Sequence, residues 1–131
     1  ITLSVKALEF SSASTSPYFQ LGNSTSYLTT TYDSSSISIS NTGNSGTGAS
    51  TNGIIFANSA DMSTTIAYSG HATFIKETGT DIWNCTGMIR RETGVFTDIF
   101  GGRIDVTATL TRIMIGSGGF DGSGTVTVTV E

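Results

Sequence analysis

The residues able to do chemistry are few and scattered. The chain has one histidine (His71), one cysteine (Cys85) and ten carboxylates. The many serines leave a Ser-His-Asp triad open by residue count alone, but no G-x-S-x-G elbow presents a nucleophile. The acids form no D-x-D run of the kind used in calcium loops, and a lone cysteine excludes an intramolecular disulfide or a multi-cysteine zinc site. We therefore expect no enzymatic activity and no cofactor or metal, with Cys85 as a small buried hydrophobe.

Aromatic side chains are the better candidates for binding. Aromatic rings stack on sugar faces, and a rim of Asn, Ser and Thr satisfies sugar hydroxyls without a heavy desolvation cost. Tyr27 and Tyr32 fall in polar segments and are expected to be exposed, with Asp33 beside them. Trp83 alternates in phase with Cys85, which favours burial, so its role as a binding residue stays open. The predicted ligand-binding residues are Tyr27, Tyr32, Asp33 and Trp83.

The composition narrows the class of protein. Of the 131 residues, 37% are hydrophobic and only 12% are charged, and the net charge is -4. This balance argues against binding to nucleic acid or to an acidic membrane surface. No apolar run approaches the roughly 20 residues that span a bilayer, so membrane insertion is not expected.

The elements that must position these residues are strands, because apolar and polar residues alternate with a period of two. The clearest strands are expected at 1–10, 65–77 with a bulge or bend at Gly70, 82–92, 103–115 and 125–131. Separate polar strands are expected at 27–33 and 37–40, and a hairpin turn at 78–81. Residues 41–52 carry too little apolar surface to offset their ordering entropy, so a long loop is expected there.

Roughly eight to ten short strands with regular turn signals predict an antiparallel β-sandwich or jelly roll. The sequence shows no internal boundary, so residues 1–131 are expected to form a single domain. In the strand at 103–115, Arg112 falls on the apolar face and would need a carboxylate partner.

The closing segment carries a family resemblance. It reads GRIDVTATLTRIMI over 102–115 and FDGSGTVTV over 120–128. This resembles the C-terminal pattern of bacteriophage tail fibre and tailspike proteins, roughly L-T-R-I-R-I-T-T…G-x-D-x-F-D-A-G-x-I-N-I-x-Y-E. The match covers about the last 50 residues. It departs from the pattern at Met114, in place of the second arginine, and at Val130, in place of the terminal tyrosine.

The resemblance implies a β-sandwich that forms a homotrimer and caps the end of a fibre or spike. The chain would then be the C-terminal part of a longer phage tail protein, located in the virion tail and extracellular. Its partners would be other virion proteins and a host-surface polysaccharide or lipopolysaccharide. Asp121 or Glu131, across the trimer, would be the carboxylate partner of Arg112.

Two other functions stay open from the sequence. The chain could be a capsid decoration protein, or another virion structural protein, without receptor binding. It could also be a stand-alone carbohydrate-binding module, or an adhesin or pilus subunit.

Overall fold

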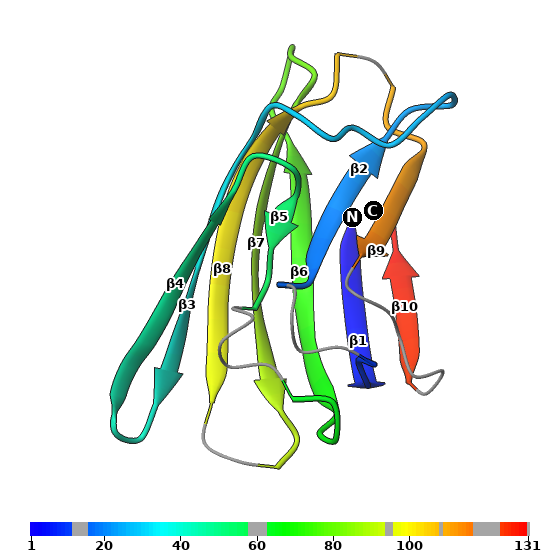
Figure 1. The fold of residues 1–131 in the computed structure, drawn as a ribbon. Coiled ribbons are helices and arrows are strands. Elements are labelled where there is room, and N and C mark those ends of the chain that lie inside the picture. The colour runs from blue at the N-terminus through cyan, green and yellow to red at the C-terminus, as the bar shows by residue number, and fades with distance from the viewer. Residues whose placement is uncertain (12–15, 58–62, 94–95, 108, 117–123, 131) are drawn as a thin grey trace.

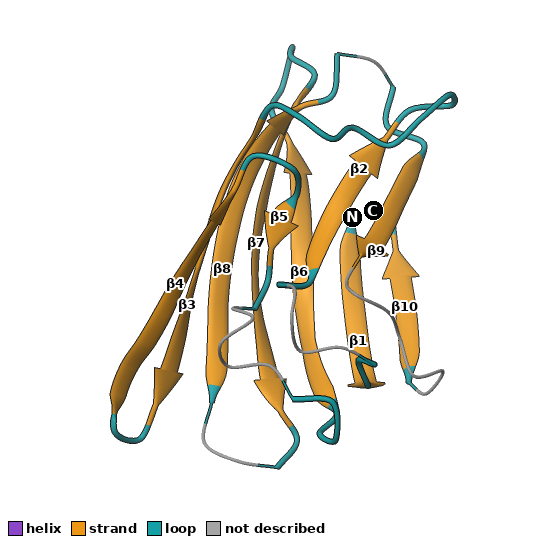
Figure 2. Ribbon diagram, in the orientation of Figure 1, coloured by secondary structure: helices purple, strands orange, loops and turns teal. Residues whose placement is uncertain are grey.

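The computed structural model describes residues 1–11, 16–57, 63–93, 96–107, 109–116 and 124–130. Within these ranges the chain forms ten strands and no helix (Figure 1, Figure 2). The strands make two antiparallel sheets that pack against each other. The predicted antiparallel β-sandwich is confirmed.

The two sheets differ in size. The larger has seven strands, in the order β10 (Thr125–Thr129), β1 (Thr2–Leu8), β6 (Tyr68–Lys76), β7 (Ile82–Arg91), β8 (Thr97–Asp105), β3 (Tyr32–Ser40) and β4 (Gly43–Ser50). The smaller has three strands, in the order β5 (Ile54–Ile55), β2 (Tyr18–Gly22) and β9 (Arg112–Gly116). The larger sheet therefore has an inner face, toward the smaller sheet, and an outer face, toward solvent.

The core between the sheets is built from aromatic rings. The ring centroid of Phe19 in β2 lies 4.6 Å from that of Phe56, 5.7 Å from that of Phe74 in β6 and 5.9 Å from that of Phe100 in β8. Phe10 lies 6.2 Å from Phe56 at the border of the same cluster. All five rings are buried. Their tilted and edge-to-face arrangements are those that aromatic pairs prefer, so the cluster joins both sheets.

The alternation of apolar and polar residues predicts the central strands well. Leu3 and Val5 of β1 and Ala72 and Phe74 of β6 are buried on the inner face. β6 and β7 form the predicted hairpin, whose turn is closed by hydrogen bonds at Glu77, from Glu77 N to Ile82 O and from Thr80 N to Glu77 O.

The prediction of a loop over residues 41–52 is wrong. Residues 43–50 form β4, the edge strand that pairs with β3 from Ser34 to Ser40. Backbone hydrogen bonds to β3 hold β4 in the sheet, and these bonds do not require apolar side chains. β3 itself is one strand, and it runs through the serine-rich stretch that separates the two polar strands expected at 27–33 and 37–40.

The single strand predicted over residues 103–115 is also wrong. β8 ends at Asp105 and β9 begins at Arg112, and the two strands belong to different sheets. Thr107, between them, has a positive φ of 54°, and its backbone N–H donates to Asp105 Oδ1. At this turn the chain passes from the larger sheet to the smaller one. The alternation of inward and outward residues changes phase there, so residues of β9 do not continue the pattern of β8.

Gly70 is not itself the bulge. Val5 pairs with Gly70 and Leu8 with Tyr68, so three steps along β1 face two steps along β6. The extra residue therefore lies on β1, where Ala7 has a positive φ of 53°. Such a bulge bends the strand and increases its twist.

β10 closes one edge of the larger sheet without being covered. Its residues Val126 and Val128 pair with Val5 and Leu3 and share their inner face. Yet Val126 is 42% exposed and Val128 is 55% exposed, while Val5 and Leu3 are buried. These valines form an exposed apolar strip, the β10 strip, together with Val130.

No helix able to cross a membrane occurs in the ranges that the structure describes.

Candidate functional site

Tyr32 does not have the exposure expected of a binding residue. Its side chain is buried, and its hydroxyl accepts a hydrogen bond from Leu21 N at 2.7 Å and donates to Leu21 O at 3.3 Å. Burial raises the pKa of this hydroxyl to about 12, although the hydrogen bond to Leu21 partly opposes the rise. The ring therefore ties β3 to β2 across the core, and a ligand cannot reach it without opening the sandwich.

Trp83 and Tyr27 are both partly buried. Trp83 packs against the core and lines a depression of about 550 Å³ together with Phe74 and Leu110. Its indole Nε1 is buried and has no hydrogen-bond partner among the described residues. Tyr27 forms an isolated bridge with Gly22 at the end of β2. Neither residue lies beside Asp33 in the sheet.

Asp33 is exposed on the outer face of the larger sheet, and strand register gives it polar neighbours. It pairs with Arg103 of β8, and Arg103 pairs with Asn84 of β7. These three residues form the polar row, which crosses three adjacent strands. The Asn84 amide donates to Glu77 Oε1 at 3.0 Å, which orients its carbonyl oxygen and holds the side chain in place.

A hollow adjoins the polar row at Gly101. It has a volume of about 360 Å³ and is lined by Asp33, Asn84 and Arg103, with Ser35 and Thr86 beside Gly101. The hollow exists because Gly101 has no side chain, while its register partners Ser35 and Thr86 carry only short ones. An added Cβ at Gly101 would meet only Cys85 O, at 3.4 Å, so nothing beneath the surface requires glycine there.

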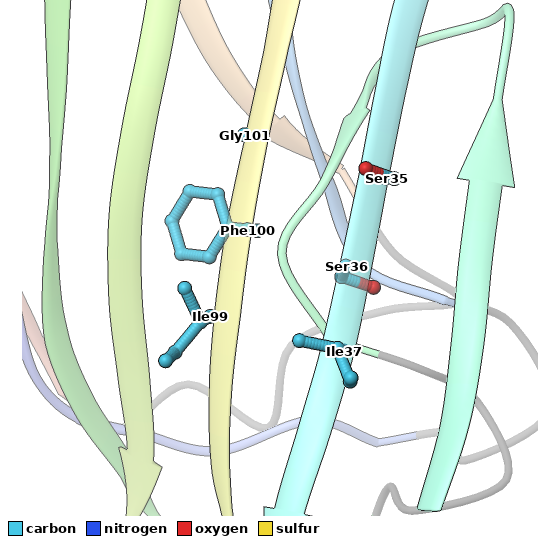
Figure 3. Close-up of a pocket in the computed structure, with 6 residues that line it drawn as sticks. All are labelled: Ser35, Ser36, Ile37, Ile99, Phe100 and Gly101. Atoms are coloured by element: carbon cyan, nitrogen blue, oxygen red, sulfur yellow. The ribbon is translucent and has the colours of Figure 1, made fainter. Parts of the chain in front are cut away.

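Apolar side chains border the other side of Gly101. Ile37 of β3, Ile99 of β8 and Met88 of β7 pair in register and form the apolar row. Ile99 is 46% exposed and Met88 is 41% exposed. Figure 3 shows Ile37 and Ile99 on neighbouring strands, below Ser35 and Gly101, in a second hollow of about 390 Å³.

The outer face around Gly101 is suited to a polyhydroxyl ligand. Arg103 donates hydrogen bonds, Asp33 accepts them and Asn84 does both, so vicinal hydroxyls can be matched as donors and as acceptors. The apolar row offers a surface for the C–H face of a ring. All these groups are at least partly exposed in the free protein, so a ligand meets them without a rearrangement of the core.

Arg103, Asn84 and Gly101 are site residues that the sequence did not single out. Their positions in alternating strands indicate that they face away from the core. What the sequence lacks is the register that places β3, β7 and β8 side by side. The chemistry of aromatic side chains suits sugar binding, but most of the described aromatic rings pack in the core.

Of the other reactive side chains, Cys85 lies beneath this surface and His71 lies at its border, beside Met88 of the apolar row. Cys85 is buried, and burial raises the pKa of its thiol to about 12, so the reactive thiolate does not form near neutral pH. His71 is exposed on the outer face between Ser4 and Met88. Within the described ranges, no three metal-binding side chains come together.

Arg112 does not lie on a buried apolar face. It is exposed at the start of β9, and its Nη2 donates to the backbone carbonyl of Ser24 at 2.8 Å. The predicted partners Asp121 and Glu131 lie outside the described residues. The mistaken placement follows from the turn at Thr107, which breaks the alternation on which it depended.

Comparisons of the chain with family models, with curated proteins and with solved structures find no match.

Proposed function

We propose that this chain is the terminal domain of a bacteriophage tail fibre or tailspike, extracellular in the virion tail, and that it binds a host-surface polysaccharide or lipopolysaccharide. The polar row beside the hollow at Gly101 is the observation that carries the binding role. The resemblance of the closing segment to phage tail proteins supports the location. In this proposal the domain acts by binding, without catalysis.

The location of the surface suits a receptor-binding role. The polar and apolar rows lie on the outer face, which is not covered by the smaller sheet. Only 12% of the residues are charged, so the glycan meets hydroxyls and amides over most of the surface. Charged contacts are then concentrated at Asp33 and Arg103.

Asp33→Asn is the direct test of the binding role. We expect it to weaken saccharide binding about tenfold or more, because a charge-assisted hydrogen bond to a sugar hydroxyl becomes a neutral one. The measurement is retention of the labelled domain on a panel of purified bacterial lipopolysaccharides and capsular polysaccharides, followed by titration with the retained one.

Glu92→Gln is the matched control, because this exposed carboxylate lies beyond the other end of β7 and accepts a hydrogen bond from Ser69 Oγ that glutamine can also accept. The control should bind as the wild type does. Failure of the wild type to bind any of the saccharides, or unchanged binding by Asp33→Asn, would count against the proposal.

The proposal includes a homotrimer, and the β10 strip supports association with further copies of the chain. β10 is the outermost strand at one edge of the larger sheet, and among the described strands it has a neighbour on one side only. Residues 125–130 alternate threonine and valine and carry no charge, although the whole chain has a net charge of -4. Edge strands that stay unpaired usually carry charges, bulges or proline, and β10 has none of these.

Val128→Lys tests this association. A lysine in the β10 strip introduces a charge that a neighbouring copy would have to desolvate, so we expect the mutant to be a monomer at concentrations where the wild type forms a trimer. Light scattering on a sizing column across a dilution series measures the mass.

Thr127→Lys places the same charge on the outer face of the same strand and should leave the trimer intact. A wild-type mass equal to one chain at every concentration would contradict self-association through β10.

The β10 strip also favours one alternative, a virion structural or capsid decoration protein without receptor binding. Such a protein would use its uncovered valines against a neighbouring virion protein and would have no need of the polar row. It would bind phage particles and show no retention on the saccharide panel.

A further inference from the structure

The outer face of the larger sheet carries a row of hydroxyls that extends far beyond the hollow at Gly101. Register pairs place its members side by side across six strands, from β3 to β10. The members of this hydroxyl row are Ser35, Gly101, Thr86, Thr73, Thr2 and Thr129. All five side chains are short and hydroxylated, and all are exposed or partly exposed.

The hydroxyl row lies between two rows of different chemistry. On one side is the polar row, in which Asn84 also pairs with Ile75 of β6. On the other side is the apolar row, which continues through His71 and Ser4. Residues two positions apart in a strand are separated by about 6.8 Å. The three rows therefore run parallel to one another across the strands, with this distance between neighbouring rows.

The depressions on this face are shallow, and this bears on the size of the ligand. Both hollows beside Gly101 are open to solvent, so a ligand bound there would stay largely exposed. Sites for small ligands, in contrast, bury most of the ligand surface. One sugar ring would gain little here. Affinity would have to come from several units bound side by side, each making a few contacts.

We propose that the ligand is a linear, extended polysaccharide chain that lies along the hydroxyl row, across the strands. This inference rests on the proposed function. Neighbouring strands are about 4.8 Å apart, close to the length of one pyranose unit in an extended chain, so each strand meets about one sugar. The polar row then faces the hydroxyl edge of the chain near β3, β8 and β7, and the apolar row faces its C–H surface.

The twist of the sheet adds a preference for the shape of the chain. Adjacent strands are rotated by about 20 to 25°, so the outer surface turns steadily along the hydroxyl row. A polysaccharide with a helical twist can follow this surface over six strands, whereas a flat ribbon or a branched cluster would meet only two or three strands.

The experiment measures affinity as a function of ligand length. Oligosaccharides of increasing length, cut from the polysaccharide that the wild type retains, are titrated by calorimetry from the monosaccharide to the octasaccharide. We expect affinity to rise with each added unit up to about six units, the number of strands that the hydroxyl row crosses.

Thr73→Val tests whether the polysaccharide lies along the hydroxyl row. It removes one hydroxyl from β6, two strands away from Arg103, and keeps the shape of the side chain. We expect about three- to tenfold weaker binding of the longest oligosaccharide and unchanged binding of the disaccharide. Thr125→Val, on the same face of β10 but outside the hydroxyl row, should change neither.

The outcomes separate this inference from the proposed function. Affinity that stops rising at the disaccharide, or long oligosaccharides that bind Thr73→Val as tightly as the wild type, would overturn the inference and leave the proposed function standing. Retention of no saccharide by the wild type would overturn both.

Discussion

Replacing Phe19 by alanine is expected to lower the free energy of unfolding by about 3–5 kcal/mol, the usual range for removing a buried phenylalanine. Phe19 contacts Phe56, Phe74 and Phe100, and it is the ring of β2 that joins the smaller sheet to the larger one. Its removal leaves a cavity among rigid rings that cannot collapse to fill it. Since small domains are stable by only about 5–15 kcal/mol, the mutant should be near the limit of folding.

Urea unfolding followed by tryptophan fluorescence measures this change, because Trp83 packs against the same core. Ile75→Val is the control, since Ile75 is 63% exposed and lies outside the β10 strip, so losing one methyl group should change stability by less than about 0.5 kcal/mol. A loss below about 1 kcal/mol for Phe19→Ala would show that the smaller sheet is not held by this cluster.

Gly70→Ala is expected to destabilise the larger sheet although it adds only one methyl group. A Cβ at Gly70 would lie 2.1 Å from Met88 O and 2.7 Å from Ile89 Cα, both in the backbone of β7. Backbone cannot move aside as a flexible side chain can, so β6 and β7 must separate at the centre of the sheet. We expect a loss of about 1–3 kcal/mol in the free energy of unfolding, as for other overpacked sites.

Gly101→Ala provides a comparison within the same sheet. Its new methyl group would make only an ordinary contact, so stability should change little. Thermal unfolding of both mutants, side by side, distinguishes crowding from a general effect of replacing glycine in a strand. Equal stability of the two mutants would contradict the close approach of β6 and β7 at Gly70.

The sequence predicts the strands whose side chains alternate between core and solvent. β6 and β7 are of this kind, and the turn between them is marked by Thr78 and Gly79. β4 could not be predicted, because it is held by backbone pairing with β3 and contains no large apolar residue. The break at Thr107 was hidden because the strands on both sides alternate, with neither glycine nor proline between them.

The inner face of β3 shows another limit of the hydrophobic pattern. Ser34 and Ser38 are buried, and they are satisfied by specific partners rather than by solvent. Ser34 Oγ donates to Gly53 O at 2.8 Å, and Ser38 Oγ donates to the buried carboxylate of Asp98. A run of serines in the sequence predicts an exposed polar segment. Ser34 and Ser38 are nevertheless buried, because the folded chain supplies hydrogen-bond acceptors for their hydroxyls.

The candidate site was predictable in part. Asp33 lies on the exposed face, beside the hollow, but the rings of Tyr32 and Trp83 pack in or against the core. Aromatic rings are the largest apolar groups available to fill the core of a small sandwich. A ring that fills the core is then not available to bind a ligand. The neighbours of Asp33 depend on the register among β3, β8 and β7, which involves segments about 50 to 70 residues apart.

The order of the strands has a consequence for how fast the chain folds. Among the described strands, five of the eight pairings join strands that do not follow each other in the sequence, for example β1 with β10 and β2 with β9. Folds dominated by such distant pairings fold in milliseconds to seconds, far more slowly than helical bundles. During synthesis, β1 has no partner on either side until β6 has emerged from the ribosome. Over that interval its alternating apolar face is open to association with other nascent chains.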